Sequence, residues 1–179
     1  FCLEVSKPRF EQLQKNYRHT SHVRCFNFSS IAKNQFPTPE EVIRFYQTTH
    51  TTLNNVSIEE VLHWLKQDLD YLTKYPDILE NGIELIKRAY QIEHFDLVVI
   101  DGSEFTGKVE LELVYGAKII CLDDINAYKN YENLQRLSKD PNYVFLNLNW
   151  NLGNGYAIFK RIIPKPAGIS AIIHTKNEA

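Results

Sequence analysis

The sequence predicts an α/β fold: a mostly parallel sheet with an antiparallel C-terminal hairpin and a helical insertion at about 36–93. Short apolar stretches with strand character alternate with segments of helical periodicity, which is typical of parallel α/β sheets. Near the C-terminus, two strand-like stretches, 143–150 and 156–162, flank a turn rich in Asn and Gly, which indicates a β-hairpin. We expect a single domain over 1–162 and a C-terminal tail over 163–179.

The composition is typical of a globular domain and gives no sign of a nucleic-acid or membrane partner. The chain has 179 residues, 44% hydrophobic and 23% charged, which suits one globular domain. The net charge is −2 and the basic residues are scattered, so we expect no nucleic-acid and no membrane partner. No transmembrane run or signal peptide is found, and Cys2, Cys25 and Cys121 lack metal-binding spacing, so a cytoplasmic location is predicted. Because Phe1 is not preceded by an initiator Met, we expect the sequence to be part of a longer chain.

The first elements are expected to be a strand over 1–5, a helix, and a second strand over 23–28. Ser6 is the expected N-cap of the helix, and Pro8 lies in its first turn, where proline is well tolerated. One face of this helix is apolar at helical spacing, with Phe10, Leu13 and Tyr17.

The insertion is predicted to hold three helices. Two begin at capping boxes of the S/T-x-x-E type, at Thr38 and Ser57. The helix after Ser57 has the clearest apolar stripe and is expected to end at Pro76. The third is expected to start at Asp77 and to include Tyr90. The insertion is far longer than a crossover needs, and it is interpreted either as a cover over a ligand site or as a buttress or dimer surface.

The second half is predicted to alternate between strand 95–100, helix 104–115, strand 117–122 and helix 128–138. The segment 104–115 is ambiguous, because Val109–Leu113 alternates in polarity like a strand. We predict a helix there, because a parallel crossover needs about a dozen residues.

Two of the predicted strands end in carboxylates: Asp101 follows the first, and Asp123 and Asp124 follow the second. The carboxyl ends of parallel strands meet at one edge of a sheet, where α/β proteins bind ligands. Asp101 suits a metal ligand, a general base or a helix cap. Asp123 and Asp124 repel each other, and a divalent cation with oxygen ligands would stabilise them. Alternatively, Asp124 or Asn126 caps the next helix and Asp123 faces solvent.

Polar residues after the first two strands form a second group of candidates. Glu4 could accept hydrogen bonds from a ribose diol, or it could be a surface or capping carboxylate beside Ser6. Asn27, Ser29 and Ser30 could line an adenine pocket, or they could be ordinary polar residues of a loop. The six histidines form no HExxH-like cluster, and no P-loop or GxSxG motif occurs.

The stretches FDLVVIDGSEF, AKIICLDDIN and NGYAIFKR, taken together, resemble the second half of class I S-adenosylmethionine-dependent methyltransferases. The resemblance is closest to the branch of small-molecule O-methyltransferases. The stretch CLEVSKPRFEQL is similar to the second strand of that fold, with its ribose-binding acid. The resemblance covers residues 1–32 and 94–162.

This resemblance implies a Rossmann-like methyltransferase sheet and methyl transfer from S-adenosylmethionine to a small-molecule acceptor, at oxygen. Metal-dependent members use Mg²⁺ or another divalent cation. The implied cofactor-binding residues are Glu4, Asn27, Ser29, Ser30 and Asp101, and the implied metal ligands are Asp101, Asp123 and Asp124. The catalytic candidates are Asp101 and Glu104. Relatives often have Lys or His near the position of Glu104, so Glu104 is either the general base or an acid that only complements the helix dipole.

The sequence departs from the family in two respects. The Gly-rich loop that holds the methionine end of the cofactor is absent, and the insertion 36–93 is not part of the common core. The main alternative is therefore a non-catalytic methyltransferase-like module that uses the insertion to bind a partner. A dinucleotide-binding enzyme is a third candidate, which the C-terminal hairpin disfavours. A homodimer is compatible with the sequence, and the acceptor is not predicted.

Overall fold

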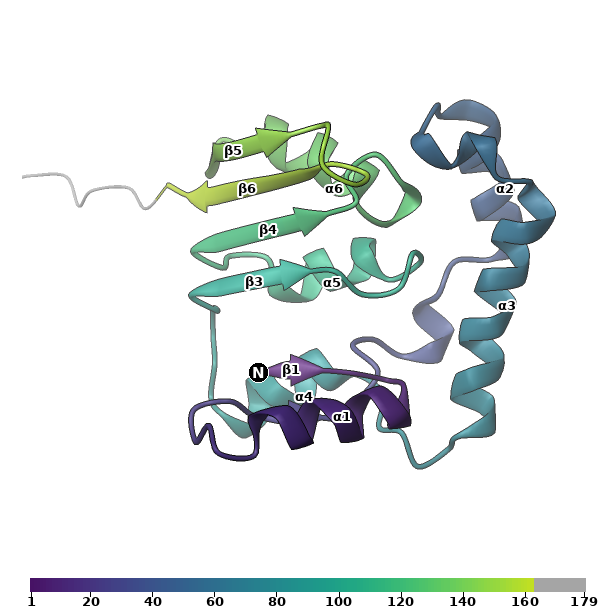
Figure 1. Cartoon of the computed structure of the whole chain (residues 1–179). Coiled ribbons are helices and arrows are strands. Elements are labelled where there is room, and N and C mark those ends of the chain that lie inside the picture. Colours follow the sequence, from purple (N-terminus) through teal and green to yellow (C-terminus); the bar gives the residue numbers. More distant parts are fainter. Residues whose placement is uncertain (163–179) are drawn as a thin grey trace, which may run out of the picture.

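Two β-sheets and six α-helices form the mixed α/β fold of residues 1–162, the part of the chain described by this computed structural model (Figure 1). The smaller sheet pairs β1 (Cys2–Leu3) in parallel with β2 (Cys25–Phe26). Helix α1 (Lys7–Tyr17) connects these two strands, as expected. The predicted tail, 163–179, lies outside the described residues.

The larger sheet has the strand order β3-β4-β6-β5. Strands β3 (Leu97–Ile100) and β4 (Ile119–Asp123) are parallel, with Ile100 opposite Leu122. The predicted hairpin is confirmed: β5 (Tyr143–Asn149) and β6 (Tyr156–Arg161) pair antiparallel, and β6 also pairs antiparallel with β4.

The expected single, mostly parallel sheet is not found. The described residues form two sheets, in which β1–β2 and β3–β4 are parallel while β4–β6 and β5–β6 are antiparallel. No strand among the described residues pairs with the outer edge of β3. Leu97 and Val99 point to the face of β3 away from the core and are 54% and 58% exposed, although they are apolar.

The opposite face of the larger sheet is covered by α5 (Gly107–Val114) and α6 (Tyr128–Lys139). The ambiguous segment 104–115 is thus helical, because Glu110, Leu111 and Val114 share one buried helix face despite the alternating pattern. The core between the layers consists of side chains from both, among them Ile100, Leu111, Ile120, Leu122, Leu137 and Phe159.

The first two helices of the insertion, α2 (Pro39–Thr48) and α3 (Ile58–Lys74), pack together beyond the carboxyl ends of β3 and β4 (Figure 1). We call these two helices the helical hairpin. The predicted capping box of α2 is present: Glu41 N–H donates to the Thr38 hydroxyl, and Thr38 N–H donates to the Glu41 carboxylate. Ser57 caps α3 by accepting from Glu60 N–H at 3.2 Å.

The third helix of the insertion, α4 (Gly82–Ala89), begins five residues later than predicted. The residues before it form a turn and an isolated bridge instead: Ser29 N–H donates to the Leu79 carbonyl at 2.9 Å, and Leu79 forms a parallel bridge with Phe28. Ile83 of α4 belongs to the core of the larger sheet. This helix is therefore part of the crossover from β2 to β3 rather than of the helical hairpin. None of the helices described is both long enough and apolar enough to cross a membrane.

Candidate functional site

The carboxylates predicted at the strand ends come together. Asp101, Asp123 and Asp124 each present a carboxylate oxygen, and these three oxygens all lie within 4.8 Å of one another. The parallel pairing of β3 with β4 brings Asp101 next to the end of β4, as the sequence predicted. The candidate site therefore lies at the edge of an α/β sheet where ligands bind.

The loop after β4 is held in a shape that turns Asp124 toward this edge. Asp124 has a φ of 53°, in the left-handed region that few residues other than Gly adopt. The loop is fixed by the hairpin turn, because Ile125 N–H donates to the Gly155 carbonyl at 3.1 Å and Asn126 N–H donates to the Asn154 carbonyl at 3.0 Å. Gly155 allows this approach, because a Cβ atom there would lie 2.9 Å from Ile125 Cγ1.

Lys129 from the first turn of α6 reaches into the three carboxylates. Its Nζ lies 2.7 Å from Asp124 Oδ2 and 3.1 Å from Asp101 Oδ1, and its side chain is only 6% exposed. Burial disfavours the charged form of Lys129, but the hydrogen bonds and charges of Asp124 and Asp101 outweigh burial and raise its pKa. Lys129 is therefore held as an ammonium ion, and it supplies these carboxylates with a counter-charge other than the divalent cation that the sequence predicted.

Asp123 holds its proton more tightly than an ordinary aspartate does. Burial raises its pKa, and a hydrogen bond with Asp101 and the charge of Asp124 raise it further, against the effect of Lys129. Asp101 and Asp123 thus share a hydrogen bond, as two neighbouring carboxylates do when one of them keeps a proton.

A buried pair of amides in α6 fixes the spacing of the strand ends. Asn130 is fully buried, and its Nδ2 donates to the carbonyls of Ile100 at 3.1 Å and of Asp123 at 2.5 Å. Asn133 Nδ2 donates in turn to Asn130 Oδ1 at 2.8 Å. One side chain therefore bridges the two strands next to the residues that carry the site.

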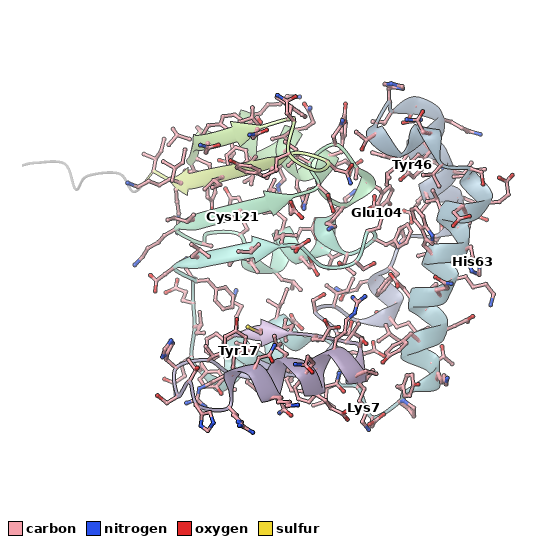
Figure 2. All side chains as sticks on the ribbon, viewed as in Figure 1. Lys7, Tyr17, Tyr46, His63, Glu104 and Cys121 are labelled. Carbon is pink, nitrogen blue, oxygen red and sulfur yellow. The ribbon has the colours of Figure 1, made fainter. Side chains whose placement is uncertain are left out.

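Glu104 lies beside the carboxylates, between the strand ends and the helical hairpin (Figure 2). Its carboxylate accepts the Lys129 backbone N–H at 3.3 Å. Burial raises the pKa of Glu104 to about 7, although that hydrogen bond and the charge of Lys129 lower it. A carboxylate with a pKa near neutrality suits general base catalysis at physiological pH.

Aromatic rings from the helical hairpin and from α6 surround Glu104. Tyr46 of α2 stacks on Tyr128 with ring centroids 6.4 Å apart, and Phe105 packs against Tyr128 at 5.9 Å. The Tyr46 hydroxyl is buried and has no hydrogen-bond partner within residues 1–162. Burial and then the charge of Glu104 raise the pKa of Tyr46, so its hydroxyl keeps its proton.

A second contact ties the helical hairpin to the loop after β3. The Ser103 hydroxyl donates a short hydrogen bond to the carboxylate of Asp68 in α3. Burial raises the pKa of Asp68, and the bond from Ser103 opposes this. The loop that carries Asp101 and Glu104 is thus attached to α3.

Glu110 lies under the same loop. It is 5% exposed, and its Oε1 accepts a hydrogen bond of 2.6 Å from the Ser30 hydroxyl. A Cβ atom on Gly102 would lie 2.6 Å from the same oxygen, so a side chain larger than that of Gly would clash there. Glu110 therefore connects the loop after β2 to the loop after β3.

The predicted cofactor residues lie at the ends of β1 and β2 and have partners within the protein. Glu4 Oε1 accepts the Ser6 N–H at 2.7 Å, as its capping interpretation required. Asn27 Nδ2 donates to the carbonyls of Glu4 and Val5. The Ser29 hydroxyl donates to the Ile31 carbonyl at 2.8 Å, and the Ser30 hydroxyl donates to Glu110.

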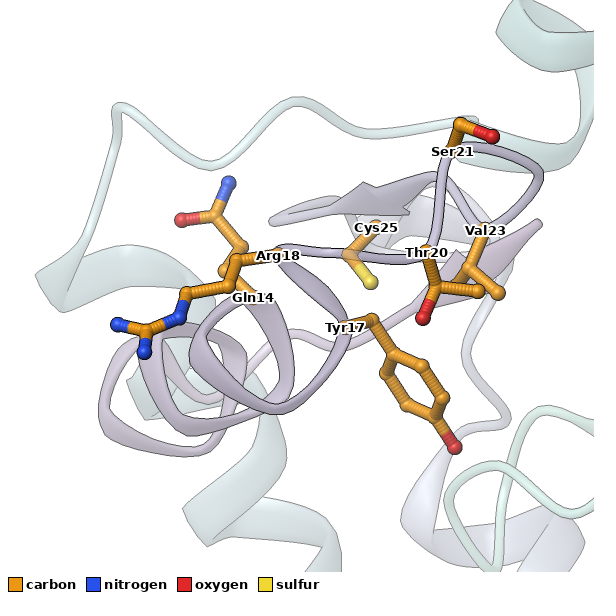
Figure 3. Close-up of a pocket in the computed structure, with 7 residues that line it drawn as sticks. All are labelled: Gln14, Tyr17, Arg18, Thr20, Ser21, Val23 and Cys25. Atoms are coloured by element: carbon orange, nitrogen blue, oxygen red, sulfur yellow. The ribbon is translucent and has the colours of Figure 1, made fainter.

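Two hollows of the described surface lie away from the carboxylates. The larger, about 420 Å³, is near the C-terminal end of α1 and the start of β2, at the opposite end of the strands (Figure 3). Its lining consists of Gln14, Tyr17, Arg18, Thr20, Ser21, Val23 and Cys25. The smaller, about 250 Å³, lies on the helical hairpin and includes Tyr46. Neither hollow is lined by an acid of the candidate site. The candidate site is therefore identified by its cluster of ionisable side chains and not by a pocket.

Sequence reasoning missed five residues of the site: Tyr46, Asp68, Glu110, Lys129 and Asn130. Only Lys129 gave a signal, because it is the first basic residue after the Asp123–Asp124 pair. No protein-family model matches the sequence, and a search of curated proteins finds no match. The resemblance to methyltransferases therefore rests on the motifs alone.

Proposed function

We propose that this chain transfers a methyl group from S-adenosylmethionine to an oxygen atom of a small molecule. The observation that carries the proposal is the meeting of Asp101, Asp123 and Asp124 at adjacent parallel strand ends, beside Glu104. These strand ends hold the motifs on which the methyltransferase resemblance rests. The Rossmann-like class of the fold belongs to the same proposal.

Glu4 and Asn27 retain the hydrogen-bonding capacity that the cofactor would need. Glu4 Oε1 is occupied by Ser6 N–H, so Oε2 is available to accept a ribose hydroxyl. Asn27 uses its amide N–H groups on backbone carbonyls, which leaves Oδ1 to accept from the adenine amino group. These bonds also orient both side chains before any ligand arrives.

Ser29 and Ser30 are assigned supporting roles, because each donates its hydroxyl hydrogen within the protein. Ser29 is also buried. We infer that these residues shape the wall beside Asn27 rather than donate to the adenine.

Glu104 is proposed as the general base. S-adenosylmethionine supplies an electrophilic methyl group on its sulfonium. The acceptor oxygen attacks the methyl carbon as the carbon–sulfur bond breaks, and Glu104 takes the proton of the acceptor hydroxyl. Its pKa of about 7 lets it be ionised near neutral pH and still bind that proton. Asp101 orients the acceptor.

The predicted metal ligands do not fit a divalent cation in their present arrangement. Two of the three predicted ligands, Asp101 and Asp124, are already paired with the Lys129 ammonium. The proposed reaction therefore includes no metal-dependent step.

Glu104→Gln tests the proposal. The measurements are calorimetric titration of S-adenosylmethionine into the full-length protein and transfer of a labelled methyl group to a panel of hydroxylated small molecules. We expect Glu104→Gln to bind the cofactor like the parent but to turn over at least about 100-fold more slowly. The matched control is Glu112→Gln, an exposed acid of the neighbouring helix, which should keep full activity. Absence of cofactor binding by the parent protein would refute the proposal.

A non-catalytic binding module is the second candidate function. It is favoured by the ion pairs that Asp101 and Asp124 form with Lys129 and by the position of both hollows away from the three aspartates. The same titration separates the two functions, because this alternative requires neither cofactor binding nor an effect of Glu104→Gln.

A further inference from the structure

We propose that the Lys129 ammonium is the resident cation of the acidic site and does the electrostatic work that a divalent metal would otherwise do. Lys129 Nζ lies 2.7 Å from Asp124 and 3.1 Å from Asp101. This cation is a side chain of helix α6, whereas a metal ion would have to bind from solution. The proposed consequence is a site that needs no metal.

The position of Lys129 is built into the fold. Its side chain is 6% exposed, whereas the lysines of the other ion pairs described are more than half exposed. Its backbone N–H donates to Glu104, and its backbone carbonyl packs so closely on α5 that a Cβ atom on Gly107 would lie 2.1 Å away. The neighbouring residue, Asn130, bonds to both strand ends. Contacts of its backbone N–H and carbonyl therefore fix the position of the Lys129 backbone.

A metal ion bound by all three acids would share the carboxylates of Asp101 and Asp124 with the Lys129 ammonium. Two positive charges within contact distance of the same two carboxylates repel each other, and the repulsion is stronger in a buried site than in water. A divalent cation could bind all three acids only if the lysine left a nearly dry position.

The ammonium also has a donor to spare for the reaction. It carries three N–H groups, and two of them are accounted for by Asp101 and Asp124 within the described residues. The third can donate to an acceptor oxygen, whose negative charge in the transition state it would stabilise. This second role rests on the proposed function, whereas the role as resident cation does not.

Binding of Mn²⁺, measured by calorimetry without S-adenosylmethionine, tests the resident-cation role separately from methyl transfer. We expect weak binding by the parent protein and binding at least about tenfold tighter by Lys129→Met, because the substitution frees the carboxylates and removes a contacting positive charge. Adding Asp124→Asn to Lys129→Met should reverse the gain. The control is Lys108→Met, which removes an exposed lysine between the same two helices and should change nothing.

A measurement on the parent protein covers the case in which Lys129→Met does not fold. The side-chain ammonium signal of Lys129 in an NMR spectrum, assigned by its loss in Lys129→Arg, should be protected from exchange and unchanged by millimolar Mg²⁺. Displacement of this signal by Mg²⁺ would overturn the proposal, as would a Lys129→Met variant that binds Mn²⁺ no more tightly than the parent. If metal binding behaves as expected but methyl transfer is absent, the proposed function fails and the role of Lys129 stands.

Discussion

Glu104→Gln should make the protein more stable while it removes activity. In the folded protein, burial raises the pKa of Glu104 from 4.5 to about 7. This difference corresponds to about 3 kcal/mol by which the fold disfavours the ionised carboxylate. Gln has nearly the same shape and carries no charge, so the substitution removes this cost.

The gain depends on pH in a defined direction. Below pH 4.5 the carboxyl group is protonated in both the folded and the unfolded chain. As pH rises from there to about 7, the unfolded chain releases the proton first, so the folded state of the parent protein loses stability through this window. Above it the loss is complete. The advantage of Glu104→Gln should therefore grow from zero at about pH 4 to about 3 kcal/mol at about pH 8.

Urea unfolding of parent and variant across this pH range measures the effect. The control is Glu112→Gln, whose carboxylate is 56% exposed and whose substitution should change stability little at any pH. A constant difference between Glu104→Gln and the parent at all pH values would refute the raised pKa. Turnover by the parent should rise with pH through about 7 as Glu104 ionises, and a flat profile would refute its role as base.

Three further substitutions test other parts of the site. Asn130→Ala should destabilise the fold by about 2–4 kcal/mol in urea unfolding, because two buried carbonyls lose their donor; a loss below about 1 kcal/mol would contradict the bridging role. Gly107→Ala should lower the melting temperature, because its Cβ would lie 2.1 Å from the Lys129 carbonyl oxygen; an unchanged or higher value would disprove this contact. Tyr46→Phe should not destabilise the protein in urea unfolding, since the buried hydroxyl lacks a partner in residues 1–162; a loss of more than about 1 kcal/mol would contradict this.

The strands and the meeting of the acids could be predicted because both follow from local pattern. An apolar run that ends in Asp indicates a strand end, and two such ends on neighbouring parallel strands must adjoin. The two predicted capping boxes indicated the starts of α2 and α3 for the same reason, although at Ser57 only the bond from Glu60 N–H forms. The start of α4 could not be predicted, because Leu79 is held by Phe28 and Ser29, about fifty residues earlier in the chain.

The pairing of Lys129 with the acids was missed because the sequence gives the separation of residues along the chain but not the direction in which their side chains point. No Lys or Arg adjoins Asp123 or Asp124 in sequence, and the nearest basic residue after the pair is Lys129, five residues beyond Asp124. The left-handed turn at Asp124 folds the chain back, however, so that the first turn of α6 points its lysine at the acids. A single unusual φ value thus reverses the electrostatic interpretation of the site.

Packing of the helical hairpin affects the pKa of the proposed base, Glu104. Glu104 would be an ordinary exposed acid if its loop ended in solvent, and its pKa is raised first of all by burial. The helical hairpin contributes to that burial, because Tyr46 stacks on Tyr128 beside Glu104, and Phe105 belongs to the same buried cluster as Val61 and Leu65 of α3. We infer that packing of the hairpin contributes to the raised proton affinity of Glu104, which the proposed reaction requires. A change that moved α2 away from the strand ends should lower the pKa of Glu104 before it disturbed the sheet.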